Sequence, residues 1–359
     1  LKAYSPFNNG GIAVTFFFVL SGFLITYLLL RERRDTGDVS VRNFYVRRIL
    51  RIWPLYFLLV FLGTLAIPSL LGLIGYAYDA PYTFGDVIGY YVFFTPFVVN
   101  ILYGHHLLEP LWSIGVEELF YILWAPLFKF VRGHILTILL GVIAVKTALS
   151  TGVFVFGAGP VVTGIVEMLK FEAMAIGGLA AYAVYHRRRA ISESVVFSIP
   201  VQVFLISFIV VRLLAIRYLV GASAFFAYLY TTFLFSEYLQ MVLFAWLIVN
   251  VSLNTRSVLR LEHRALNFLG HISYGIYMYH MLVIFAVVLV FKSPLNALGH
   301  AASTVVFYLL ITLGTVLVSY VSRRFFEDGF LRLKRRFTYQ GKRSEAAREA
   351  VTAQELPAV

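Results

Sequence analysis

The stretch IAVTFFFVLSGFLITYLLL, residues 12–30, decides the fold, because it carries no charged side chain and is long enough to cross a bilayer. A membrane-spanning helix needs ~20 mostly apolar residues. Comparable apolar runs follow along the chain, at residues 52–74, 84–103, 112–131, 134–150, 161–185, 195–219, 225–250, 266–291 and 301–320. The pattern predicts an all-α fold, a polytopic transmembrane helix bundle with about nine or ten membrane segments.

Composition supports this class of fold. Apolar residues make up 60% of the 359 positions, charged residues make up 13%, and the mean hydropathy is +0.83. A soluble domain is about half apolar and about a quarter charged. A signal peptide has a single short apolar core, so it does not account for repeated long runs. The absence of cysteine excludes disulfides, thiolate catalysis and cysteine-ligated metal sites.

We interpret the net charge of +12 as a sign of how the chain is oriented in the membrane, and not as a sign of a nucleic-acid partner. Most lysines and arginines lie in loops between apolar runs, where they favour the cytoplasmic side of a membrane. No basic patch interleaved with aromatic residues marks a nucleic-acid surface, so we expect no nucleic acid and a lipid bilayer as the surroundings.

The arginine clusters predict the topology. They begin at Arg31, Arg187, Arg256 and Arg323. Five apolar segments separate the first two clusters, and an odd number would place them on opposite sides. We therefore expect the segment at 84–103 to re-enter the membrane or lie in its interface, which puts residues 112–121 toward the extracytoplasmic side. The expected organisation is one transmembrane domain over 1–336, in the inner (plasma) membrane, and a cytoplasmic, disordered tail over 337–359.

Two adjacent carboxylates enter one of these segments. In LWSIGVEELFY, residues 111–121, Ser113, Glu117 and Tyr121 follow i, i+4, i+8 spacing and share a helix face. Glu118 lies about 100° around the helix from Glu117. The pair can bind a cation, hold a proton or orient a catalytic group. It can equally be a pair of interfacial helix-start charges favoured by the helix dipole.

A late segment carries a histidine within an apolar run. In HISYGIYMYH, residues 271–280, Ser273, Tyr277 and His280 share a face by i, i+4, i+7 spacing. An ionisable residue at the centre of a span costs about 3 kcal/mol, so it needs a partner, water or a function. His280 is a candidate site residue, and the alternative is a buried histidine bonded to a neighbouring helix.

Three arginines precede the apolar run at 52–74. Arg47, Arg48 and Arg51 lie close together, and guanidinium groups bind phosphate in a bidentate manner. The alternative is a positive-inside anchor.

Two further groups are interpreted as structural. Glu167, Lys170 and Glu172 are expected to pair with one another, and no metal-ligand set completes His105 and His106, so no metal site is predicted.

These segments, together with FFFVLSGFLI at 16–25, occur in the order seen in acyltransferase family 3, and the chain resembles that family over nearly all of 1–336. The family's segments are a Phe-rich Ser-Gly helix, an Arg-Arg-x-x-Arg-Ile-x-Pro stretch, a Trp-Ser-x-x-Val-Glu-Glu helix and a late Ser-Tyr-x-Ile-Tyr-x-x-His helix. The chain departs from the pattern at Leu119, where the family usually has Gln.

The resemblance implies an enzyme, a membrane O-acyltransferase that moves an acyl group, usually acetyl, from an acyl-coenzyme A in the cytoplasm. The acceptor would be a carbohydrate hydroxyl on a cell-surface polysaccharide, glycolipid or glycoside. By analogy, the coenzyme A phosphates would bind Arg47, Arg48 and Arg51, with acetyl-CoA as a substrate and no permanent cofactor. A polar cavity with a base and an oxyanion donor would be formed by Ser113, Glu117, Glu118, Tyr277 and His280.

The family's first helix, which carries an arginine and a histidine held to be catalytic, has no counterpart in this chain. We expect an N-terminal truncation, with an extended protein active and this chain alone inactive. The alternatives are a mis-assigned start of the sequence and a non-catalytic relative of the family. The alternative function is a proton-coupled transporter or flippase that uses Glu117, Glu118 and His280. Against it, the sequence shows no inverted repeat of the kind many transporters have.

Overall fold

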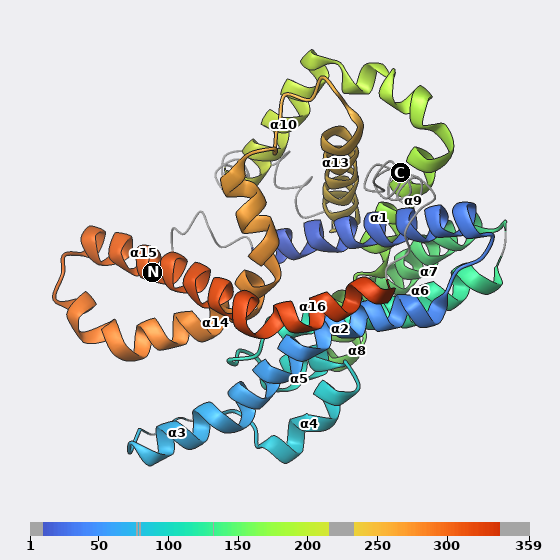
Figure 1. Cartoon of the computed structure of the whole chain (residues 1–359). Helices are drawn as coiled ribbons and strands as arrows, with labels where there is room; N and C mark the ends of the chain where they lie inside the picture. Colours follow the sequence, from blue (N-terminus) through green and yellow to red (C-terminus); the bar gives the residue numbers. More distant parts are fainter. Residues whose placement is uncertain (1–9, 77, 79, 132, 215–232, 338–359) are drawn as a thin grey trace, which may run out of the picture. The chain divides into compact units, whose positions relative to one another are not determined.

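The structure is a computed structural model that describes residues 10–76, 78, 80–131, 133–214 and 233–337. These residues form helices and loops, with no strand among them (Figure 1). Seven helices of the described part are long and apolar enough to cross a membrane, which supports the predicted transmembrane helix bundle. The total of about nine or ten segments stays a prediction. The expected tail lies outside the described residues from position 338 onward, as does part of 195–250.

Two compact units divide the chain, and each is described separately. Unit 1 comprises the described residues of Leu1–Val39 and Phe120–Leu261. Its helices are α1 (Gly10–Thr36), the second half of α6 (Leu111–Phe130), α7 (Ile135–Phe156), α8 (Pro160–Met168), α9 (Phe171–Ser192), 3₁₀-helix η2 (Val195–Phe197), α10 (Ile199–Leu214) and α13 (Phe233–Leu253). The apolar segment predicted at 161–185 is thus two helices, because the chain leaves helical geometry at Leu169 and Lys170.

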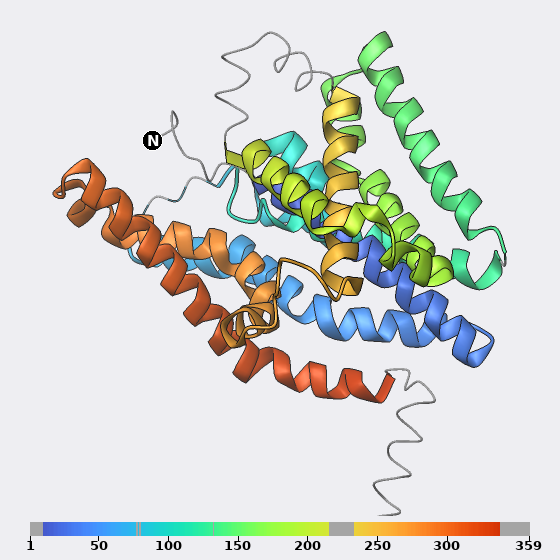
Figure 2. The ribbon, with the colours of Figure 1, turned by 90° about the horizontal axis from the view of Figure 1, so that it is seen from above.

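The centre of unit 1 is the pairing of α1 with α9, and α13 packs against both (Figure 2). Two glycines permit this approach. A Cβ at Gly22 would lie 2.0 Å from the carbonyl oxygen of Met174, and a Cβ at Gly177 would lie 1.9 Å from that of Val19. Small residues let membrane helices approach to backbone contact. Beside this contact the hydroxyl groups of Ser21 and Tyr121 form a hydrogen bond.

Buried charges in unit 1 form ion pairs between helices. Lys146 on α7 lies 3.5 Å from Glu172 on α9, and Lys170 lies 2.7 Å from Glu237 on α13. Lys170 and Glu172 thus form ion pairs with residues of other helices, while the charge of Lys170 also acts on Glu172, and the mutual pairing of Glu167, Lys170 and Glu172 stays a prediction. The ion-pair partners of Lys170 and Glu172 lie far away in the sequence, and only the fold brings them close.

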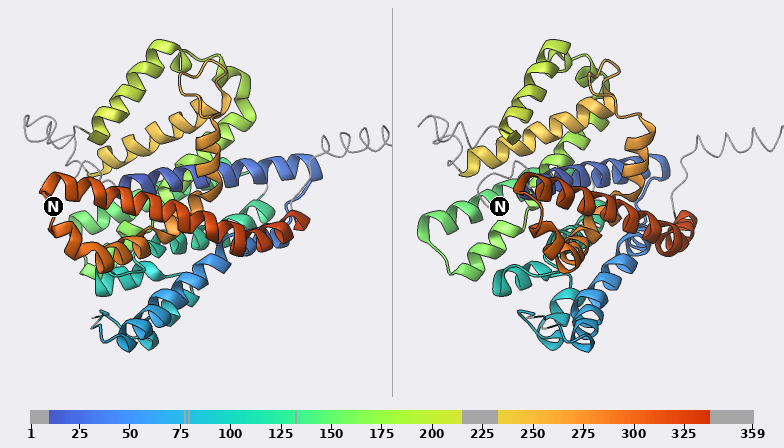
Figure 3. Two further views of the ribbon diagram at one scale, coloured as in Figure 1. Left: turned by 60° about the vertical axis from the view of Figure 1, so that its left-hand side comes forward. Right: turned by 90° about the vertical axis from the view of Figure 1, so that its left-hand side faces the viewer.

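Unit 2 comprises the described residues of Ser40–Leu119 and Glu262–Val359. Its elements are α2 (Val41–Phe61), π-helix η1 (Leu62–Ala66), α3 (Ile67–Leu73), α4 (Phe84–Val92), α5 (Pro96–Tyr103), the first half of α6, α14 (Arg264–Asn296), α15 (His300–Ser322), π-helix η3 (Arg323–Glu327), α16 (Asp328–Lys334) and 3₁₀-helix η4 (Arg335–Phe337). Helices α14 and α15 run side by side as a hairpin (Figure 3), and α16 packs against α2.

The segment at 84–103 is interrupted. A capping box between Thr83 and Asp86 begins α4, and Pro96 begins α5. Between them Phe94 has φ +55°, the left-handed region that side chains other than glycine rarely adopt. The nine residues of α4 extend over about 13 Å, well short of a bilayer core of about 30 Å. The expectation that this segment re-enters or lies in the interface stays a prediction.

The loop before α6 buries a histidine in a hydrogen-bonded network. The Nε2 atom of His106 lies 2.8 Å from Oδ1 of Asn100, while Nδ1 accepts from the Leu108 amide at 3.2 Å and lies 3.3 Å from the Tyr82 hydroxyl. His105 instead pairs with Glu109 at 2.8 Å. In the part of the chain that the structure describes, no cluster of metal-ligating residues is present. The hydrogen bonds of His106 support its interpretation as a structural residue.

We expect this loop to lose stability in acid. Burial, with the charge of nearby His105, lowers the pKa of His106 from 6.5 to about 4. The unfolded state binds the proton first, so stability is complete above pH 6.5 and falls as the pH decreases toward 4, by on the order of 2 to 3 kcal/mol. Hydrogen exchange of the Leu108 amide, corrected for its intrinsic pH dependence, measures this change.

The control is His106→Gln, which lacks the titrating group and should show no such dependence. Equal protection of Leu108 at pH 4 and pH 7 in the native protein would contradict the prediction.

The ion pair between Lys146 and Glu172 makes a second prediction. Both side chains are buried, so Lys146→Met leaves an uncompensated carboxylate and should lower the free energy of unfolding by about 3 to 5 kcal/mol. The double variant Lys146→Met/Glu172→Met should recover most of this loss. Thermal unfolding in detergent measures both, with Arg189→Met in an exposed pair as the control. Equal losses in the single and double variants would show that the pair is not the cause.

Candidate active site

All eight predicted site residues belong to unit 2, so their geometry is described within one compact unit. Three elements supply them. Helix α2 carries Arg47, Arg48 and Arg51, α6 carries Ser113, Glu117 and Glu118, and α14 carries Tyr277 and His280.

Helix α2 presents its arginines from its first three turns. The Ser40 hydroxyl caps the helix by accepting a hydrogen bond from the Asn43 amide at 3.3 Å, so the helix begins before the arginines. Arg47 donates to the Phe337 carbonyl at 2.8 Å, and the Arg48 guanidinium lies 5.5 Å from the centre of the Phe44 ring. The N-terminal end of α2 therefore holds its cations in defined positions.

Two further cations join this group from the other end of the chain. The positive charges of Arg47, Arg48, Arg51 and Arg323 all act on Lys334 of α16. The sequence pattern used the cluster that begins at Arg323 only as an indicator of orientation. The packing of α16 against α2 reveals the proximity of Arg323 and Lys334 to the α2 arginines.

Helix α14 is attached to its surroundings by three tyrosines. The hydroxyl of Tyr274 donates to the Ile52 carbonyl of α2 at 2.8 Å, and that of Tyr277 donates to the Pro110 carbonyl at 2.8 Å. The hydroxyl of Tyr279 donates to the Ser322 hydroxyl of α15 at 3.0 Å. The closely spaced tyrosines of the late motif thus contact three different parts of unit 2.

The structure brings Ser113 and Tyr277 together. Their hydroxyl oxygens are 2.7 Å apart. The Pro110 carbonyl lies within hydrogen-bond distance of both hydroxyls, at 2.8 Å from Tyr277 and 3.3 Å from Ser113, so either hydroxyl can donate to the other while its partner donates to Pro110. The two hydroxyls form a compact polar pair between α6 and α14.

Glu118 is buried with one carboxylate oxygen unsatisfied. Its side chain is 4% exposed, and Oε2 accepts a hydrogen bond from Trp53 Nε1 at 3.2 Å. Oε1 has no hydrogen-bond partner among the residues that the structure describes. Leaving a buried acceptor unpaired costs about 1 to 3 kcal/mol, more for a charged group. Glu118 can therefore accept a hydrogen bond from an incoming group.

Glu117 and His280 each interact with Tyr277. Glu117 is half-buried, and its charge acts on both Tyr277 and Glu118. Nδ1 of His280 lies 2.5 Å from the Tyr277 carbonyl, which requires a proton on Nδ1 and leaves Nε2 of the neutral ring as an acceptor.

Each predicted helix face lies on one helix, Ser113, Glu117 and Tyr121 on α6 and Ser273, Tyr277 and His280 on α14, but the hydrogen bonds of two of these residues do not join the candidate site. Ser273, expected to share a face with Tyr277 and His280, bonds back to the Gly270 carbonyl of its own helix. Tyr121, expected beside Ser113 and Glu117, belongs to unit 1, where it bonds to Ser21.

The support for Glu118 could not be read from the sequence. The ring of Trp53 lies 5.2 Å from that of Phe94, the residue with positive φ, and Phe94 also packs on Tyr56 at 5.0 Å. A Cβ at Gly115 would lie 2.6 Å from the Phe94 carbonyl oxygen, so only glycine fits there on α6. The break between α4 and α5 thus packs on both α2 and α6 beside the carboxylate.

The comparisons with known proteins agree with the family named by the motifs. The family model described as an acyltransferase domain, that of acyltransferase family 3, matches residues 2–324. "Putative peptidoglycan O-acetyltransferase YrhL" of Bacillus subtilis is 32% identical over 138 residues, which cover 36% of this chain and 21% of that protein. The peptidoglycan O-acetyltransferase OatA of Listeria monocytogenes is 30% identical over 134 residues, 34% of this chain and 20% of that protein.

The matches therefore span about a fifth of the length of these relatives. No solved structure matches the chain. Because the family model covers most of its length, the chain belongs to acyltransferase family 3.

Proposed function

We propose that the chain is the membrane part of an O-acyltransferase that moves an acetyl group from acetyl-coenzyme A to a hydroxyl of a cell-surface glycan. The observation that carries this proposal is the unpaired Oε1 of buried Glu118, on the same helix as the Ser113 hydroxyl that bonds Tyr277. A glycan of the peptidoglycan type is the acceptor class favoured by the names of the relatives. Neither the family match nor these relatives support the transporter or flippase alternative.

The donor would be held by the basic end of α2. Coenzyme A carries a diphosphate and a separate ribose phosphate, and arginine forks match the geometry of phosphate oxygens. Arg47, Arg48 and Arg51 are supported in this role by the nearby charges of Arg323 and Lys334. This assignment places the arginine-rich end of α2 and the C-terminus on the cytoplasmic side of the plasma membrane.

The reaction would proceed by direct attack of the acceptor hydroxyl on the thioester carbonyl. Glu118 Oε1 accepts the hydroxyl proton as the new C–O bond forms, and the Ser113 hydroxyl turns from Tyr277 to donate its proton to the oxyanion. Collapse of the tetrahedral intermediate breaks the C–S bond, and the proton that Glu118 accepted passes to the departing coenzyme A sulfur, which regenerates the carboxylate. Glu117 and His280 add further polar groups around the reacting atoms. Nε2 of His280 is a second group that can accept the proton of the acceptor hydroxyl.

The proposal is tested by supplying labelled acetyl-coenzyme A to membranes that contain the 359-residue chain or a version extended upstream of Leu1. Acetylated carbohydrate is the readout, with thioester hydrolysis measured beside it. Neither product from either form would overturn the proposed reaction.

We expect Glu118→Gln to reduce the rate of transfer by about 100-fold or more, because a general base contributes about that much and the amide is a poor proton acceptor. Trp53→Phe, which removes the hydrogen bond to Oε2, should cause a smaller loss. The matched control is Glu193→Gln, an exposed carboxylate at the end of α9. Full transfer by Glu118→Gln at equal protein level would rule out Glu118 as the base.

The second test concerns the donor. Arg48→Gln should raise the KM for acetyl-coenzyme A by about 10-fold or more, since a hydrogen bond to a charged group contributes about 1.5 to 3 kcal/mol. The kcat value should change less. Arg42→Gln, an exposed arginine on the same helix, removes the same charge and is the control. An equal KM increase in both variants would indicate general surface attraction instead of a phosphate site.

A further inference from the structure

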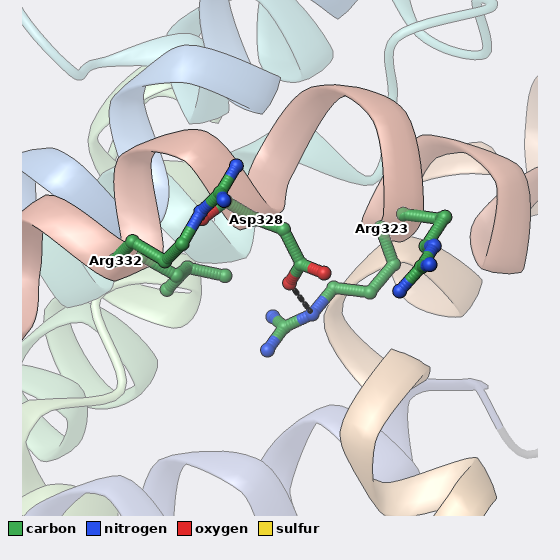
Figure 4. Close-up of a pocket in the computed structure, with 5 residues that line it drawn as sticks. Arg323, Asp328 and Arg332 are labelled. Carbon is green, nitrogen blue, oxygen red and sulfur yellow. Dashed lines mark hydrogen bonds and ion pairs between the residues drawn. The ribbon is translucent and has the colours of Figure 1, made fainter.

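A pocket, which shares Arg323 with the group of cations beside α2, lies at the C-terminal end of the described chain. It has a volume of about 440 Å³ and is formed by Arg323, Arg324, Asp328, Leu331 and Arg332 (Figure 4). All five residues come from η3 and α16, so the pocket lies within unit 2. Arg324, Leu331 and Arg332 have no role in the proposed transfer reaction.

Carboxylates hold part of this pocket in place. The Nε atom of Arg323 lies 3.1 Å from Oδ1 of Asp328, and its guanidinium also lies 3.9 Å from Glu327. Glu327 is buried and accepts a hydrogen bond from Ser322. Arg332 donates from Nε to the Asp328 carbonyl at 3.3 Å. Figure 4 shows Asp328 between the two arginines.

The charge of the lining favours an anion. Three guanidinium groups and one carboxylate leave a net charge of +2. The acidic group is already bonded to Arg323. Arg324 and Arg332 are exposed, and guanidinium groups that face a cavity match the oxygens of a phosphate group.

The surroundings favour a lipid as the source of that phosphate. The pocket lies in the last part of the candidate span His300–Lys334, where an apolar helix ends in a basic segment. Phe325, next to Arg324, is 82% exposed, and Phe330 and Leu333 are also exposed. Basic pockets at the ends of membrane helices bind anionic headgroups, while neighbouring apolar side chains contact acyl chains.

We propose that this pocket binds the phosphate of an anionic phospholipid headgroup. Arg324 and Arg332 supply the forked donors, Arg323 is positioned by Asp328, and Phe325 contacts the acyl chains. The proposal goes beyond the transfer reaction and does not depend on the identity of the acyl donor.

The test compares the lipids retained by the 359-residue chain from nanodiscs of phosphatidylcholine and phosphatidylglycerol, measured by native mass spectrometry. Arg324→Gln/Arg332→Gln should weaken the affinity for phosphatidylglycerol about tenfold or more, because the variant removes both exposed guanidinium groups that bind the phosphate. The single variant Arg324→Gln, at an exposed position where folding is not at risk, should weaken it in the same direction. The control Arg256→Gln/Arg260→Gln removes the same charge from another basic loop.

A second arm titrates coenzyme A against the same variants. Loss of phosphatidylglycerol in the pocket variants alone, with coenzyme A binding unchanged, supports the proposal. Equal losses in pocket and control variants would reduce the effect to general attraction of basic loops to anionic lipid. Weakened coenzyme A binding with unchanged lipid retention would assign the pocket to the acyl donor and overturn the lipid proposal.

Discussion

Unit 2 depends on the hydrogen bonds that three tyrosines of α14 make with three other elements. Tyr274 bonds to the backbone of α2, Tyr277 to the chain just before α6, and Tyr279 to the side chain of Ser322 on α15. In hydrocarbon the apolar effect does not hold helices together, so packing and such hydrogen bonds carry the association. The same helix carries His280, so the contacts that assemble unit 2 also position its candidate site.

The buried charges of the two units differ in how they are satisfied. In unit 1, Lys146 and Lys170 each have an acidic partner on another helix, as expected for charges with a structural role. In unit 2, Glu118 has a donor for one oxygen and none among the described residues for the other. A buried carboxylate oxygen without a hydrogen-bond donor lowers the free energy of unfolding. Such a loss of stability is expected at a functional site, where a substrate hydroxyl supplies the missing donor.

The helical class and the motif order could be predicted because they depend on local patterns. Long apolar runs require helices in a membrane, and the positions of Ser113, Glu118 and Tyr277 follow from motif spacing. What could not be predicted depends on contacts distant in sequence. No spacing rule links Lys170 to Glu237, and no propensity places Phe94 at positive φ, because the rest of unit 2 imposes that conformation.

The π-helical geometry of η3 determines the direction in which the C-terminal arginines point. A π-helical turn holds one residue more than an α-helical turn, and that extra residue rotates everything after it by about 100°. Removing one residue from Arg323–Glu327, with every arginine retained, would turn α16 about its axis and carry Arg332 away from Arg323. The number of residues between Ser322 and Asp328 is therefore as much a determinant of this surface as the charges that it displays.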